Sequence, residues 1–217
     1  MTARAGGLAR LIAQFNLLPS LELHPDHRPD YAPDPVWQAS ATGRFGHRHL
    51  SAHILDKERL RGDWVTAFET RERRLALLGW RALERLITLT GIALNAHWIA
   101  TSINRDEVAS LRTRLGRDNY GFAVGRARFL GVGAGWPAPR GETDRLDWIR
   151  RAGRTYVEAC AFGQPRALVR RLELRLARDD AAGALATEPP AVEPARAIAL
   201  FRKVAPEVGP ECVSLLS

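Results

Sequence analysis

The stretch TRERRLALLGWRALERLITL, residues 70–89, is the strongest indication of how the chain folds. Its apolar side chains recur every three or four residues, so they share one face of an α-helix. That face consists of Leu75, Leu78, Ala82, Leu86 and Leu89. Arginines fall between these positions and are expected on the solvated side. The stretch predicts one long core helix.

The same spacing predicts further helices on both sides of this one, and hence an all-α fold. We expect them at residues 47–60, 92–103, 105–115, 119–129, 143–160 and 194–204. Gly91 is expected to separate the core helix from the next. Asn104 followed by Glu107 has the spacing of a helix N-cap with a reciprocal acid.

Residues 168–176 fit two kinds of structure. Leu172, Leu174 and Leu176 alternate with charged residues, as in a strand, whereas Leu168, Val169 and Leu172 fit a helix. We expect a helix that passes into a short extended segment near Leu172 to Leu176. The fold class predicted is mainly helical with at most this one extended piece.

Proline and glycine mark the breaks between helices. Four prolines predict a loop at residues 24–35, and alternating glycines followed by prolines predict a second at 131–141. A stretch rich in Ala, Pro and acids predicts a mobile linker at about 178–194. At 217 residues the chain is short enough for a single core, so we expect one helical domain over residues 1–217.

The composition is that of an ordinary soluble protein, with 46% hydrophobic and 26% charged residues. No stretch approaches the roughly 18 uncharged apolar residues of a membrane span. The first 18 residues lack a signal-peptide core with a cleavage site. The two cysteines, Cys160 and Cys212, stand in no metal or redox spacing. A cytoplasmic location is therefore expected.

The net charge of +8 comes from the middle of the chain, where residues 61–178 carry 22 basic and 12 acidic side chains. The basic residues are densest at Arg150, Arg151, Arg154, Arg166, Arg170, Arg171, Arg175 and Arg178. These arginines fit either a patch that binds phosphates or an acidic protein, or a solvated helix face. No helix-turn-helix, zinc finger or RNA-binding aromatic motif accompanies them.

No set of residues predicts catalysis, a cofactor or a metal. His49 and His53 share a helix face, but the zinc-peptidase pattern needs Glu where Leu50 stands. The glycines at 131, 133 and 135 precede Trp136 and prolines rather than a helix, unlike a phosphate-binding loop. Neither cysteine has a base beside it. We expect a protein that is not an enzyme.

The order of several short motifs along the chain points to a family. They are LPSLELH at 18–24, LSAHILD at 50–56, the leucine-rich helix at 75–89, GWP at 135–137, LELRL at 172–176 and CVSLL at 212–216. In these motifs, in their order and in its length, the chain resembles the SctK/YscK proteins of type III secretion.

The resemblance implies a cytosolic, non-catalytic adaptor of the sorting platform, placed at the cytosolic face of the inner membrane by the secretion apparatus. It implies two partners, the SctQ-type pod protein and the cytoplasmic domain of the SctD-type inner-membrane ring, with membrane association only indirect. Partner contacts are expected at Trp136, Arg150, Arg154, Arg170 and Arg171. Trp136 equally fits a core anchor of its loop. The alternative hypothesis is an Arg-rich nucleic-acid-binding protein.

Overall fold

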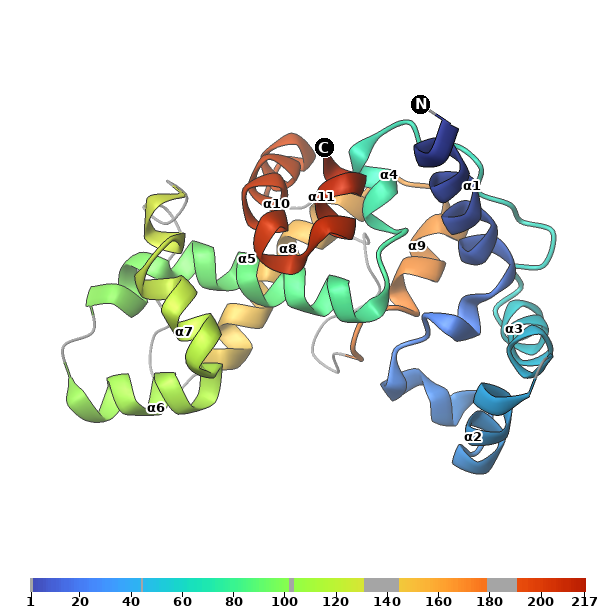
Figure 1. Cartoon of the computed structure of the whole chain (residues 1–217), viewed down its shortest axis with the longest axis horizontal. Helices are drawn as coiled ribbons and strands as arrows, with labels where there is room; N and C mark the ends of the chain where they lie inside the picture. The colour runs from blue at the N-terminus through green and yellow to red at the C-terminus, as the bar shows by residue number, and fades with distance from the viewer. Residues whose placement is uncertain (1, 44, 102–103, 131–144, 179–190) are drawn as a thin grey trace. The chain divides into compact units, whose positions relative to one another are not determined.

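The structure, a computed structural model, describes residues 2–43, 45–101, 104–130, 145–178 and 191–217. Every regular element in these residues is a helix, and none of them forms a β-strand (Figure 1). The prediction of an all-α fold is confirmed.

The elements are α-helices and 3₁₀-helices. The α-helices are α1 (Thr2–Leu17), α2 (Asp34–Thr42), α3 (Gly46–Lys57), α4 (Arg71–Leu75), α5 (Trp80–Thr101), α6 (Arg105–Leu115), α7 (Arg117–Val124), α8 (Arg145–Ala161), α9 (Arg166–Glu173), α10 (Pro194–Val208) and α11 (Pro210–Leu216). The 3₁₀-helices are η1 (Pro19–Leu21), η2 (Pro25–Asp30) and η3 (Ala127–Phe129).

The chain divides into two compact units. Unit 1 comprises residues 1–83 and 161–188, and unit 2 comprises residues 84–160 and 189–217. The chain thus enters unit 2 within α5 and leaves it at the end of α8. The single domain expected from the sequence stays a prediction. The loop expected at 131–141 and most of the linker expected at 178–194 lie outside the described residues.

Unit 1 has a buried apolar cluster that gathers side chains from distant parts of the sequence. Its members are Leu23, Tyr31, Trp37, Leu50, Ile54 and Leu174. The proline-rich segment 24–35 is anchored to this cluster, because the indole N–H of Trp37 donates to the carbonyls of Arg28 and Ala32, each at 3.1 Å. The predicted loop therefore holds a defined 3₁₀-helix, η2, before α2 begins.

The decisive stretch at 70–89 forms two helices rather than one. The side chain of Thr70 caps α4, which ends at Leu75, and α5 begins at Trp80. The carboxylate of Glu22 accepts the backbone N–H of Trp80 at 3.3 Å. At Gly79 a Cβ atom would lie 2.6 Å from that carboxylate. The prediction of a single helix was wrong because a distant acid caps a new helix start, which periodicity does not register.

Gly91 does not separate two helices, because α5 runs through it from Trp80 to Thr101. A Cβ atom at Gly91 would lie 1.9 Å from the carbonyl oxygen of Ile149, and one at Gly153 would lie 1.9 Å from that of Ile87. Here α5 and α8 cross in unit 2 with their backbones almost touching. Glycine is required at both positions by this close approach, not by a turn.

Of three local predictions, one is confirmed by the structure and two were wrong. The side chain of Asn104 caps α6 by accepting the N–H groups of Asp106 and Glu107 at 2.9 and 3.3 Å. The carboxylate of Glu107, expected to return to the cap, pairs with Arg145 of α8. The segment expected to be extended at 172–176 is the end of α9 followed by a turn, which buries all three of its leucines.

Candidate interaction surfaces

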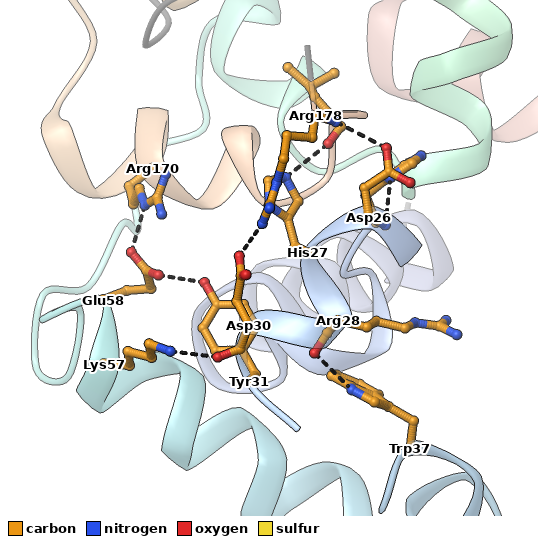
Figure 2. Close-up of polar contacts among 12 residues, drawn as sticks. Asp26, His27, Arg28, Asp30, Tyr31, Trp37, Lys57, Glu58, Arg170 and Arg178 are labelled. Atoms are coloured by element: carbon orange, nitrogen blue, oxygen red, sulfur yellow. Dashed lines mark hydrogen bonds and ion pairs between the residues drawn. The ribbon is translucent and has the colours of Figure 1, made fainter. Parts of the chain in front are cut away.

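A polar network in unit 1 joins three segments that are far apart in the sequence (Figure 2). At its centre the carboxylate of Glu58 accepts a hydrogen bond from Nε of Arg170 at 2.6 Å and another from the hydroxyl of Tyr31. Arg170 also donates to Glu173, one turn along α9, at 2.9 Å. The guanidinium of Arg170 is thus shared between two carboxylates.

The same network continues around η2. The guanidinium of Arg178 pairs with the carboxylate of Asp30, and the backbone N–H of Arg178 donates to the carboxylate of Asp26 at 3.2 Å. Lys57, in the last turn of α3, donates to the carbonyl of Asp30 (Figure 2). Arg178 is therefore bonded to two acidic residues of η2, Asp26 and Asp30.

The network shifts the protonation of its members. Burial disfavours the charged form of Glu58, but hydrogen bonds from Arg170 and Tyr31 outweigh it and lower the pKa of Glu58. Burial and the Glu58 carboxylate raise the pKa of Tyr31. Burial also lowers the pKa of His27, against a hydrogen bond with the carbonyl of Leu176. Acidic solution should therefore weaken this part of unit 1.

Two arginines of the dense basic region point into unit 1 rather than into solvent. Arg171 is 3% exposed and donates to the carbonyl of Leu60 at 3.2 Å. Arg175 is 4% exposed and donates to the carbonyl of Leu78 at 2.7 Å. Both guanidinium groups lie over the ring of Phe15. Burial lowers the pKa of Arg175 to about 10. These two charges stabilise backbone carbonyls inside the fold.

The remaining predicted contact residues have different settings. Arg150 and Arg154 lie four residues apart on α8 of unit 2, where Arg150 is exposed and Arg154 pairs with Glu158 at 3.3 Å. Arg170 belongs to the network of unit 1. Trp136 lies outside the described residues. Arg150 and Arg154 thus belong to unit 2 and Arg170 and Arg171 to unit 1, and the role of these residues in partner binding stays a prediction.

The sequence predictions missed a set of exposed large apolar side chains. In unit 1 these include Leu17, Val36, Phe45 and Trp64, and in unit 2 they include Phe129 and Val213. Trp64 is 57% exposed in the segment between α3 and α4. A tryptophan flanked by Gly62, Asp63 and Thr66 in a stretch without helical periodicity was the available signal.

No metal site is visible in the part of the chain that the structure describes. His49 and His53 are both exposed on α3, and the described residues contain no group of three or more His, Cys, Asp or Glu side chains arranged to hold an ion. The side chains of Cys160 and Cys212 are both buried. None of the helices in the described ranges has both the length and the apolar character that a membrane crossing needs.

A family model described as YOP proteins translocation protein K (YscK) matches residues 12–217. The match covers nearly the whole chain, including both units. Comparisons with curated proteins and with solved structures gave no match.

Proposed function

The chain belongs to the YscK family and is therefore a type III secretion protein, and on that premise we propose that it is a non-catalytic adaptor of the sorting platform. In this role it bridges the cytoplasmic domain of the SctD-type inner-membrane ring and the SctQ-type pod protein, on the cytosolic side of the inner membrane. Platform assembly and effector secretion depend on it.

The observation that carries this proposal is the family match over residues 12–217. The structure supports it through what its charged residues do. Charged residues such as Glu58, Arg170 and Arg175 form hydrogen bonds to other parts of unit 1. Such hydrogen bonds fix the conformation of the fold before a partner binds, as a scaffold protein requires.

Basic side chains on the surface are the proposed source of fast association with an acidic partner. Charges at the rim of an interface mainly raise the association rate, whereas buried apolar groups slow dissociation. Arg150 suits a test of this idea, since it is exposed and no hydrogen bond or ion pair holds its guanidinium among the described residues. Arg170 and Arg171 suit it less, because changing them removes bonds within unit 1.

The test measures binding of the full chain to the pod protein by surface plasmon resonance at several salt concentrations. We expect Arg150→Glu to slow association and to flatten its salt dependence, without changing the thermal unfolding temperature. Arg202→Glu, at an exposed position on α10 of the same unit, is the matched control and should have a smaller effect.

The same measurement, made with random duplex DNA in place of the pod protein, tests the alternative that the partner is nucleic acid. If the charge serves DNA, log affinity for random duplex DNA falls steeply with log salt concentration. Tight, salt-sensitive DNA binding together with no measurable affinity for the pod protein would overturn the adaptor proposal.

A further inference from the structure

We propose that the contact between η2 and residues 176–178 opens in mildly acidic solution while the rest of unit 1 stays folded, and that His27 is the group that takes up the proton. This contact is termed the η2 junction. It lies within unit 1, where Arg178 is the last described residue before position 191. The inference goes beyond the adaptor function and does not depend on which partner the chain binds.

The η2 junction is made by polar groups of η2. None of the residues of η2, Pro25–Asp30, is buried. Its links to residues 176–178 include the hydrogen bond between Nε2 of His27 and the carbonyl of Leu176 at 3.1 Å, the ion pair of Arg178 with Asp30, and the hydrogen bond from the N–H of Arg178 to Asp26 at 3.2 Å. Segments that bury few apolar groups open locally more easily than the core around them.

The residues on either side of the junction are anchored in the core. Leu23, which precedes the N-cap of η2, and Tyr31, which follows η2, both belong to the buried cluster of unit 1. Leu176, across the junction, is 1% exposed. Opening therefore frees Arg178 from η2 while the apolar core stays intact.

The neutral form of His27 fits the closed junction. A carbonyl oxygen only accepts hydrogen bonds, so Nε2 of His27 must carry the proton that it donates to Leu176. Nδ1 of a neutral ring is then unprotonated, and in acid it takes up the next proton. The hydrogen bond to Leu176 stays in place in this step. The effect of acid therefore comes from the added charge and not from a lost donor.

The surroundings of His27 oppose that charge. The ring is half-buried, and a charged ring would be repelled by the guanidinium groups of Arg178 and Arg170 (Figure 2). Burial is the largest cause and, together with these charges and that of His24, lowers the pKa of His27, although the hydrogen bond to Leu176 acts in the opposite direction.

The carboxylates around His27 already have partners. Asp30 pairs with Arg178, Glu58 and Glu173 both bond Arg170, and Asp26 accepts the N–H of Arg178 and lies 3.4 Å from Nδ1 of His24. The other charged groups next to η2 are Arg28, whose guanidinium lies over Trp37, Lys57, which bonds the carbonyl of Asp30, and Asp34 in the first turn of α2. A proton on His27 must therefore compete with arginines for the carboxylates nearby.

The difference in pKa gives the direction and the size of the effect. In the open form His27 is exposed and has an ordinary pKa of about 6.5, whereas in the closed form its pKa is lower. The open form therefore binds the proton more tightly, so the closed form loses stability as pH falls below 6.5. An exposed histidine is about nine-tenths protonated at pH 5.5, so the ratio of closed to open forms can fall by at most about tenfold between pH 7.5 and pH 5.5.

The experiment measures hydrogen exchange of backbone amides in the full chain by NMR at pH 7.5 and pH 5.5, with each rate divided by the intrinsic rate at that pH. We expect the protection of the Arg178 N–H, which bonds Asp26, to fall about three- to tenfold. The N–H of Val65, which bonds Asn16 in the same unit, should keep its protection. Equal losses at Arg178 and Val65 would mean that unit 1 unfolds as a whole, and that result, like no change at Arg178, would overturn the proposal.

His27→Gln tests which group takes up the proton. Glutamine does not titrate, and its amide N–H can still donate to the carbonyl of Leu176, so the Arg178 N–H should be equally protected at both pH values. His53→Gln, at an exposed position on α3 of the same unit, is the matched control and should keep the full pH dependence.

His24→Asn separates the two histidines near the junction. Asparagine keeps an acceptor for the N–H of Asp26, so the pH dependence at Arg178 should remain. A pH dependence that persists in His27→Gln, or that disappears in His24→Asn, contradicts the assignment to His27.

A titration of the His27 ring by NMR decides the matter if glutamine weakens the junction at both pH values. We expect the ring in the unaltered chain to titrate below pH 6.5. Arg178→Gln removes a positive charge that faces the ring and should raise the pKa of His27 toward 6.5. A ring that titrates at pH 6.5 or above in the unaltered chain would show that the closed junction does not oppose the proton, and the proposal would then be wrong.

Discussion

The crossing of α5 and α8 in unit 2 and the 58–70 loop in unit 1 are both tightly fixed, but by opposite means. At the crossing the backbones meet directly, because Gly91 and Gly153 have no side chain. Along the loop the backbone is held in place by hydrogen bonds from polar side chains such as those of Asn16 and Arg171. The crossing requires that positions 91 and 153 carry no side chain. The loop requires the polar side chains that form hydrogen bonds with its backbone.

This difference determines how each region can be damaged. The crossing is broken by adding a single methyl group, whereas the loop tolerates additions at its exposed positions and is broken by removing a hydrogen-bonding group. We also expect the two regions to differ in their response to pH, because the atoms nearest to Gly91 and Gly153 are backbone and aliphatic atoms, whereas unit 1 relies on charged side chains.

The largest expected effect is at the crossing. Gly153→Ala would place a Cβ atom 1.9 Å from the carbonyl oxygen of Ile87, so α5 and α8 must move apart. We expect a loss of about 3 kcal/mol in the free energy of unfolding, measured by urea denaturation. Gly121→Ala, in α7, is the control: nothing lies within 4 Å of its added Cβ, and stability should rise by about 0.5 kcal/mol. Equal stabilities of the two variants would contradict the close crossing.

A smaller loss is expected when the loop is released. Asn16→Ala leaves both backbone groups of Val65 without their side-chain partner, which we expect to cost about 2 kcal/mol. The amide of Val65 should then exchange its hydrogen faster, measured by NMR. Asn104→Ala, which removes a helix cap in unit 2, is the control and should cost about 1 kcal/mol without changing exchange at Val65. Slow hydrogen exchange at Val65 in both variants would contradict the pair of hydrogen bonds between Asn16 and the backbone of Val65.

These two regions also show how far sequence alone could reach. The periodic apolar face of residues 143–160 predicted α8, and Asn104 predicted the start of α6, because both signals are local. Gly91 was misread as a break, since a glycine at a close crossing and a glycine at a helix end look alike in one sequence.

The polar contacts of unit 1 escaped prediction for a different reason. Asn16 bonds Val65 across 49 positions, and Arg175 bonds Leu78 across 97. Nothing in the neighbouring residues reveals such a partner. The arginines at 170, 171 and 175 looked like a basic face in the sequence, yet Arg171 and Arg175 are buried, because long side chains can reach backbone carbonyls inside a fold.

A third prediction concerns how the free energy of unfolding depends on pH, which tests the charged network of unit 1. Since the folded-state pKa of Glu58 is lowered, its contribution to stability is present above its ordinary pKa of about 4.5 and is lost as pH falls through the lower folded value. We expect Glu58→Gln to cost about 1 kcal/mol at pH 7 and to flatten the decline in stability below pH 4.5. Urea denaturation from pH 7 to pH 3 measures this.

The control for that series is Asp56→Asn, at the same end of α3. Asp56 pairs with Arg61 on the surface, where both side chains are more than half exposed, so its removal should change stability little at any pH. A decline below pH 4.5 that is as steep in Glu58→Gln as in the unaltered chain would show that the network around Glu58 is not the acid-sensitive element.

The smallest expected effect is a gain, and it concerns the one strained backbone position found in the described loop of unit 1. At Arg59 the left-handed conformation disfavours any side chain with a Cβ atom, and glycine removes that penalty. Glycine also gives the unfolded chain more freedom, which offsets part of the benefit. We therefore expect Arg59→Gly to raise the free energy of unfolding by about 0.5 to 1 kcal/mol, measured by thermal and urea denaturation. Arg61→Gly, two residues away, has no such strain to relieve and should not stabilise the chain. If Arg59→Gly were the less stable of the two, the arginine would be contributing a contact within the fold that outweighs the strain of its backbone.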